Sequence, residues 1–291
     1  MGEALVVADG KKLIIGSENM GDPYYKTLPT QPPIQQFSGR NVMIDGIKAK
    51  EAWEYFKTTW ESNEVGSPVQ HLELTPNDLS EQARLLAKAQ TEANLFPLPK
   101  QPQASYEIAD SDIDFVTSQS ARGRGIHLRT KQIQMIVNAH NMIMIETPYL
   151  SLDEEIINLL ADKVKKNVEV IVYTNSAKSN NHPIGNPIYE SMAKRLRKLG
   201  IKVYHWAGVE TMHGKTIRVD DEVMISSSNM NPRSTHQDSE SGLVFRSKKI
   251  TQAVTNDIYT KRYRPTDRTS CFRNYWNIFL RTMLVPVSRQ F

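Results

Sequence analysis

The chain has 291 residues, a formal net charge of +4 and a single cysteine, Cys271. This length suits one large or two small domains, the weak positive charge does not by itself indicate nucleic-acid binding, and one cysteine excludes an internal disulfide framework and fits a reducing compartment. The start, Met1-Gly2-Glu3, lacks the basic region of a signal peptide, and no apolar run approaches the roughly 18 residues of a transmembrane helix. We therefore expect a cytoplasmic protein that is soluble or peripheral on the membrane.

The first 61 residues predict a hairpin followed by a helix. Residues 4–8 and 12–15 are typical strands around an Asp9-Gly10 turn. Residues 48–61 predict a helix with an apolar face, which we expect to pack into the core. That face consists of Ala49, Trp53, Phe56 and Trp60.

Residues 62–110 predict a connection that contains one helix. Thr75-Pro76 is a helix start signal, with a capping threonine and a proline at the first helical position. Pro97, Pro99 and Pro102 then interrupt regular structure. We expect the boundary between two lobes to fall in this region.

From residue 111 onward, apolar strands alternate with helical segments. The strands are predicted at 113–116, 142–146, 168–173 and 201–206, and the helices at 128–140, 152–165 and 188–196. This alternation favours a largely parallel sheet covered on both faces. Two strand ends, Glu146–Tyr149 and Thr174–Ser176, are either ordinary loops or part of a ligand site, because ligands collect at the carboxyl ends of parallel strands.

The segment from Met212 to Ser234 carries the strongest chemical signal. It is typical of a strand, an acidic turn, a second strand and a polar loop. His213 and Lys215 are two residues apart, so they share one face of the predicted strand. Together with the serines, asparagines and Arg233 of the loop, they supply an imidazole, an ammonium group and neutral donors, which suit phosphoryl oxygens.

This segment resembles the HKD signature of the phospholipase D superfamily. It reads His-x-Lys, four residues, Asp, then Ser-Ser-x-Asn, with Ser226 in place of the usual glycine and a spacer one residue shorter. The continuation Asn229–Ser234 looks like the cardiolipin synthase and phosphatidyltransferase branch. The resemblance implies an α/β fold, the phospholipase D-like α/β/α sandwich of two pseudo-symmetric lobes. It divides the chain into a remnant first lobe at 1–65, a linker with one helix at 66–110, and a second lobe at 111–291.

The N-terminus resembles the back half of a first HKD motif. Asp9 stands at the aspartate position and Gly16-Ser17-x-Asn19 is intact, but Gly2 and Ala4 occupy the histidine and lysine positions. Either an upstream half has been cut away, or the first lobe has degenerated. Asn41, at the place of an expected acidic residue, slightly favours degeneration, so we expect a truncated or degenerate first lobe.

The resemblance assigns four residues to catalysis: His213, Lys215, Asp220 and Glu240. His213 is the nucleophile that forms a phosphohistidine or, equally, the acid that protonates the leaving group. Glu240, 27 residues further on, is expected to accept the other imidazole N–H and fix the tautomer. Asp220 is more typical of a structural role.

The expected phosphate-binding residues come from both lobes. Lys215 and Asn229 would hold the non-bridging oxygens, with Ser227 as a weaker candidate, and Ser17 and Asn19 would contribute from the first lobe. Arg233 fits either phosphate binding or a loop cap. No cluster has metal-ligand spacing, so neither a metal nor a cofactor is predicted.

The C-terminal stretch Lys248–Phe291 is basic and rich in aromatic residues, which suits either a membrane interface or a helix docked on the core. The expected partners are a glycerophospholipid substrate, a membrane surface, and a second half-site supplied by a homodimer or a separately encoded half. The sequence therefore predicts a phospholipase D-like phosphatidyltransferase or phospholipid phosphodiesterase. One alternative is a phosphodiesterase that acts on nucleic acid, although we do not expect nucleic acid as a partner. The other is a catalytically incomplete lipid-binding pseudoenzyme.

Overall fold

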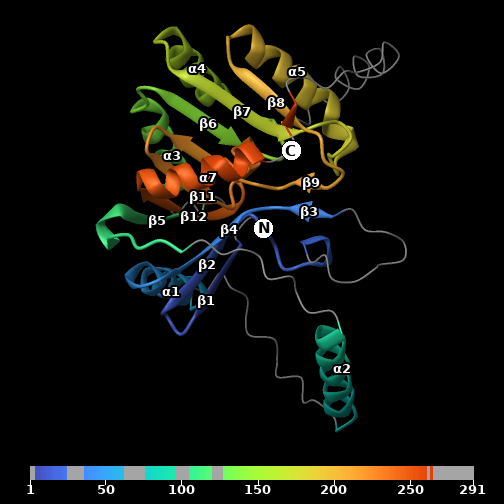
Figure 1. Ribbon diagram of the computed structural model, residues 1–291. Helices are drawn as coiled ribbons and strands as arrows, with labels where there is room; N and C mark the ends of the chain where they lie inside the picture. The colour runs from blue at the N-terminus through green and yellow to red at the C-terminus, as the bar shows by residue number, and fades with distance from the viewer. Residues whose placement is uncertain are drawn as a thin grey trace.

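A computed structural model describes residues 4–24, 36–61, 76–95, 105–119, 127–260 and 263–264. It consists of a large mixed sheet with helices on one face and a smaller sheet packed beneath the other (Figure 1). Most of the basic aromatic stretch predicted at the C-terminus lies outside the described residues.

The central sheet has eight strands. Their order is β13 (Tyr263–Arg264), β8 (Lys202–Trp206), β7 (Glu169–Asn175), β6 (Met142–Glu146), β10 (Thr216–Val219), β11 (Glu222–Ser226), β12 (Ser239–Arg246) and β5 (Ile113–Gln119). The predicted α/β class is confirmed, but the prediction of a largely parallel sheet is wrong. Among the eight described strands of this sheet, only the pairs β6–β7 and β7–β8 are parallel. The tight turn between β10 and β11 forces antiparallel pairing there, and β10 also runs antiparallel to β6.

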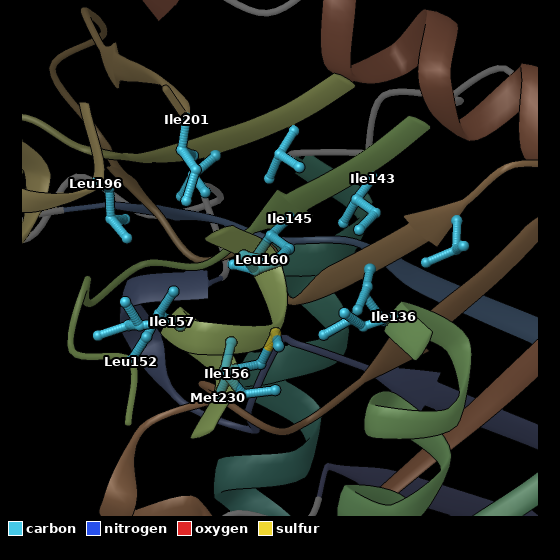
Figure 2. Close-up of a cluster of buried hydrophobic side chains, with 14 of the residues drawn as sticks. Ile136, Ile143, Ile145, Leu152, Ile156, Ile157, Leu160, Leu196, Ile201 and Met230 are labelled. Atoms are coloured by element: carbon cyan, nitrogen blue, oxygen red, sulfur yellow. The ribbon is translucent and has the colours of Figure 1, made fainter. Parts of the chain in front are cut away.

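Three helices cover one face of this sheet: α3 (His127–Val137), α4 (Glu154–Lys165) and α5 (Asn186–Lys198). Helix α4 begins where the side chain of Asp153 accepts a hydrogen bond from the Ile156 amide at 3.0 Å. Its apolar stripe then turns toward the sheet, and Ile156 and Leu160 meet Ile145 of β6 in a fully buried cluster (Figure 2). Burial of this stripe is the main stabilising term for the helical layer.

The opposite face packs against the N-terminal segment. This segment forms a three-stranded antiparallel sheet, β1 (Leu5–Ala8), β2 (Lys12–Gly16) and β4 (Asn41–Asp45), followed by α1 (Ile47–Trp60). Leu13 and Ile15 of β2 share one hydrophobic core with Val223 and Ile225 of β11. Helix α7 (Lys248–Thr260) packs into the same core through Val254 and Ile258.

Helix α1 contacts this core through its small residues. Ala49 and Ala52 are fully buried, whereas Phe56 is 41% and Trp60 is 62% exposed. The predicted burial of the aromatic face is therefore wrong. Two alanines bring the helix axis close to the sheet, and the aromatic rings stack on one another at 5.8–5.9 Å along the outer side.

A buried ion pair joins the two segments. The Arg40 guanidinium contacts the carboxylate of Glu146, and it also binds Thr216 at 2.6 Å and pairs with Asp257 of α7. The Tyr263 hydroxyl donates to Glu146 at 2.7 Å. The Glu146 side chain is fully buried, so its charge depends on these partners.

The remaining elements are short or peripheral. The predicted helix of the connecting region is confirmed as α2 (Pro76–Leu95), which stands apart from both sheets in Figure 1. The short elements are η1 (Asp22–Tyr24), β3 (Phe37–Ser38), η2 (Asp110–Asp112), η4 (Pro183–Gly185), β9 (Thr211–Met212) and α6 (Pro232–His236). Among the described residues, every helix is too short or too polar to cross a lipid bilayer.

Candidate active site

A pocket of about 270 Å³ opens where the N-terminal segment meets the ends of the central strands. Its lining comes from both segments and consists of Ala4, Ser17, Asn19, Tyr149, His182, Tyr189, His213, Lys215, Ser227, Asn229, Asn231, Arg233 and Asp238. All the residues expected to bind phosphate therefore lie at one site, together with the histidine and lysine of the motif.

The backbone around His213 is held on both sides. Strand β9 pairs in parallel with β3, and the His213 amide donates to the carbonyl of Ser38 at 2.7 Å. The buried Asn175 side chain accepts from the Met212 amide at 2.9 Å and donates to the Met212 carbonyl at 2.8 Å. The predicted loop at residues 174–176 thus acts behind the site. His213 itself lies between β9 and β10, where a single continuous strand was predicted.

Lys215 lies against the imidazole, as expected. Its Nζ is 3.0 Å from both ring nitrogens of His213, and its side chain is almost fully buried. Gly214 between them is required by close packing, because an added Cβ would stand 2.4 Å from the Glu146 carboxylate. The buried anion thus sits directly behind the His-Gly-Lys backbone.

The hydrogen bond to Ser17 fixes the tautomer of His213. Its Nδ1 is 2.6 Å from the carbonyl oxygen of Ser17, an acceptor, so Nδ1 carries the proton and Nε2 keeps the lone pair. Burial and then the Lys215 charge hold the pKa of His213 well below its usual value. The imidazole is therefore neutral near pH 7. The ring also stacks on Phe37 at 5.3 Å and meets the Tyr24 hydroxyl at 3.1 Å.

Glu240 is placed differently from its predicted role. Its carboxylate accepts from the hydroxyl of Ser227, and its second oxygen has no hydrogen-bond partner among the described residues. The Ser17 carbonyl, and not Glu240, receives the imidazole N–H. Glu240 is 1% exposed, and burial raises its pKa, while burial lowers the pKa of the nearby Lys215. Glu240 is therefore an electrostatic partner of Lys215.

Asp220 lies at the far end of β10 from the pocket. Its carboxylate accepts from the backbone amides of His140, Asn141 and Met142 at 2.8–2.9 Å, and its own φ is +49°. The structural role predicted for Asp220 agrees with this position, and its grouping with the catalytic residues does not. It fixes the turn that joins the two strands of the motif.

The phosphate-binding candidates differ in availability. The side-chain oxygen of Asn229 is buried without a partner among the described residues, while its carbonyl accepts from Thr147 at 2.7 Å. Arg233 pairs with Asp238 at the rim, at 3.2 Å. The Ser227 hydroxyl is already engaged by Glu240. Lys215 and Asn229 are therefore the better placed pair.

Several residues of the site gave no clear sequence signal. Phe37 reaches His213 through the pairing of β3 with β9, and Tyr24 reaches it from η1. Tyr149 was signalled by its position at the end of β6, whereas His182 and Tyr189 come from the loop after β7 and from α5. A hydrogen bond to a backbone carbonyl, as at Ser17, has no residue-type signature at all.

Comparisons with known proteins agree with this geometry. Residues 132–261 match the family model described as the PLD-like domain of cardiolipin synthase. The chain is 22% identical over 289 residues to cardiolipin synthase C of Escherichia coli K12, covering 88% of this chain and 60% of that protein. It is 24% identical over 275 residues to the cardiolipin synthase of Halalkalibacterium halodurans, covering 93% and 48%. The chain thus spans about half the length of these curated relatives.

The fold has a solved counterpart. The crystal structure of phosphatidylserine synthase from Haemophilus influenzae Rd KW20 superposes with a TM-score of 0.68 at 13% identity, covering 99% of this chain and 68% of that one. The similarity supports the fold, and the sequence matches support the family. Residues 132–261 therefore match the PLD-like domain of cardiolipin synthase, and the chain is similar to the cardiolipin synthase-like branch of the phospholipase D superfamily.

Proposed function

We propose that this protein transfers a phosphatidyl group, or hydrolyses a phospholipid, through a phosphohistidine on His213. The observation that carries the proposal is a buried, neutral imidazole whose Nε2 lone pair lies 3.0 Å from the Lys215 ammonium nitrogen. A neutral imidazole can attack phosphorus, and a cation beside it stabilises the charge that develops on the phosphoryl oxygens. The relatives that are named cardiolipin synthases support a glycerophospholipid as the substrate.

In the proposed reaction, Nε2 of His213 attacks the phosphorus and the bond to the leaving alkoxide breaks. The Ser17 carbonyl stabilises the positive charge that the ring gains during attack, because it holds the Nδ1 proton. Lys215 and the Asn229 amide hold the non-bridging oxygens. Water or an alcohol then displaces the histidine from phosphorus.

The half-site of the N-terminal segment lacks its own imidazole and ammonium, since Gly2 and Ala4 occupy those positions. We include in the proposal that, where this chain needs a second half-site, a homodimer or a separately encoded half supplies it. A second candidate function is a lipid-binding pseudoenzyme. It is favoured by one observation: Ala4, a side chain without charge, lines the pocket at the position of the first lysine.

The test is turnover of phosphatidylglycerol vesicles by the purified chain, with intact-mass detection of a phosphoryl adduct after an alkaline quench. The wild type should form the adduct and release glycerol, and His213→Ala should lower the rate by roughly 1,000-fold or more. The matched control is His127→Ala, an exposed histidine at the start of α3. Vesicle binding without adduct or product would replace the proposal with the pseudoenzyme. Cleavage of single-stranded DNA but not of lipid would replace it with a nuclease.

A further inference from the structure

The pocket holds a second imidazole, that of His182. We propose that His182 is the acid that protonates the leaving alkoxide, a role that the first-motif positions of this chain cannot fill. This inference rests on the proposed function, because it concerns the same phosphoryl transfer. It also goes beyond the family motif, since His182 lies in the loop between β7 and α5.

The loop that carries His182 is built by side-chain hydrogen bonds. The His182 amide donates to Oδ1 of Asn180 at 2.8 Å, and Nδ2 of Asn180 donates to Asn186 at 2.9 Å. The neighbouring Asn181 accepts from the Tyr149 hydroxyl at 2.9 Å. These bonds hold the backbone at His182, which places this residue at the pocket wall.

The ring of His182 shares a wall with the nucleophile. Tyr149 contacts both histidines edge-on, with ring centroids 5.0 Å from His182 and 6.3 Å from His213. A charge on His182 also lowers the pKa of His213, which places the two rings within electrostatic reach. No hydrogen bond from the His182 ring to another described residue is present, so both ring nitrogens are available to a ligand.

The other proton donors of the site are less suitable. Burial raises the pKa of Tyr149 to about 12 and carries that of Tyr24 and Tyr189 higher still. Burial lowers the pKa of Lys215 to about 7, but its Nζ lies 3.0 Å from both ring nitrogens of His213 and donates to the His213 carbonyl, so it is engaged at the nucleophile. An effective acid has a pKa near the working pH, and a histidine fits this requirement better than a tyrosine or a guanidinium group.

The proposed step balances as follows. As Nε2 of His213 forms a bond to phosphorus, the bond from phosphorus to the alkoxide oxygen breaks, and the proton of the His182 imidazolium passes to that oxygen. The products are a free alcohol, a phosphohistidine and a neutral His182. In the second half, neutral His182 takes the proton of the incoming alcohol or water as its oxygen bonds to phosphorus and the bond to His213 breaks.

A pH dependence follows from the same groups. Burial lowers the pKa of His182, and the groups that share its pocket are Tyr149, Tyr189, His213, Lys215, Arg233 and Asp238. The acid must be protonated, so the rate should fall as the pH rises through the pKa of His182, which lies below its usual value. The nucleophile must be neutral, and the still lower pKa of His213 sets the acidic limb.

The test compares two substrates that differ only in the leaving group: phosphatidylglycerol and phosphatidyl-p-nitrophenol in the same vesicles. The glycerol alkoxide needs a proton, whereas p-nitrophenolate leaves without one. For His182→Gln the ratio of the two rates, glycerol over nitrophenol, should fall by about 100-fold, because general acid catalysis contributes about that much or more. The part of the alkaline limb that lies below pH 7 should also disappear, which leaves the fall set by Lys215, whose pKa burial lowers to about 7. His127→Gln is the matched control, and its ratio should equal that of the wild type.

The outcomes separate the two proposals. If wild type turns over neither substrate, the proposed function fails and this inference falls with it. If wild type is active and His182→Gln slows both substrates equally, His182 only supports the loop and the inference is overturned. An unchanged ratio and an unchanged alkaline limb in His182→Gln, with full activity, would overturn it as well. A second variant, His182→Ala, guards against a proton delivered through the glutamine amide.

Discussion

The two halves of the molecule use the same local design with opposite surroundings. The N-terminal segment runs β1, β2, β4 and α1, and the second half repeats the pattern as β10, β11, β12 and α7. In the first half a cross-strand row of Val6, Ile14 and Met43 is 40–56% exposed. The corresponding row in the second half, Ile217, Met224 and Val244, is at most 2% exposed and lies in the core under the helical layer. The comparison teaches that the same hairpin and helix pattern can form with its apolar row covered or exposed, and that the cover comes from other segments.

The turns explain the spacing noticed in the sequence. Three residues join β1 to β2, from Asp9 to Lys11, whereas two residues join β10 to β11. The first turn residue has a positive φ in both, +53° for Asp9 and +49° for Asp220. The shorter spacer of the second motif is therefore a shorter turn.

The largest effect should come from separating the two halves. In Arg40→Ala the fully buried carboxylate of Glu146 loses its cation, which should lower the free energy of unfolding by about 3–5 kcal/mol. Urea unfolding followed by fluorescence measures this change. The control is Arg84→Ala on α2, where an exposed pair with Glu81 should contribute nothing measurable. Equal stability of Arg40→Ala and wild type would show that the halves do not depend on this pair.

The paired core positions should give the next effect. Met224→Ala opens a cavity under the helical layer and should lower the free energy of unfolding by about 2–4 kcal/mol. Its counterpart Ile14→Ala should lower it by less than about 1 kcal/mol, because the side chain is already partly exposed. Both are read from the same urea transitions. Similar values for the two variants would mean that the exposed row is covered in solution.

Substitutions of the two turn aspartates should change the free energy of unfolding by smaller amounts than the core substitutions. Partial burial would raise the pKa of Asp220, but the three backbone amide donors outweigh it and the pKa is lowered. The stabilisation is thus present above the unfolded-state pKa of about 4 and is lost as the pH falls through the lower folded-state value. Asp220→Asn should lower the free energy of unfolding by about 1–2 kcal/mol at pH 7, and the difference should vanish in acid. Asp9→Asn should change the free energy of unfolding at pH 7 by less than Asp220→Asn does.

The smallest effect is expected on the outer side of α1. Trp60→Gln should change the free energy of unfolding by no more than about 0.5 kcal/mol, because Trp60 is 62% exposed and touches mainly Phe56. A thermal unfolding scan measures it. A loss of several degrees would restore the prediction that this aromatic face packs into the core.

Local sequence patterns predicted most helices and strands, whereas the strand pairing and the buried side of each helix depend on contacts between distant segments. The hairpins, α2 and β6 could be predicted because alternation, turn residues and caps act over a few positions. The antiparallel pairing of β10 with β6 brings together segments about 70 residues apart, and no local pattern encodes it. Helix α1 shows what helical periodicity does not predict. The helical pattern is compatible with burial of either Ala52 or Trp60, and the tertiary contact with the sheet determines that the alanine side is buried.

The residue types of the candidate site could be predicted from the sequence, but their hydrogen-bond partners could not all be predicted. The motif spacing brought His213 and Lys215 together and indicated Asn229 and Ser17 at the same pocket. It assigned the imidazole proton to Glu240, while the structure gives it to the Ser17 carbonyl. A main-chain oxygen is present at every residue, so spacing alone cannot single it out.

The hydrogen bond between His213 and the Ser17 carbonyl also has a consequence for protein synthesis. The Ser17 carbonyl that holds His213 precedes it by 196 residues. At about 5–20 residues per second, the N-terminal hairpin leaves the ribosome roughly 10–40 s before its histidine exists. During that interval the Leu13 and Ile15 face of β2 has no β11 to pack against, and an exposed apolar strand face is a condition that favours intermolecular strand pairing. Yield in a cell should therefore depend on elongation rate and on chaperones that bind short apolar strands.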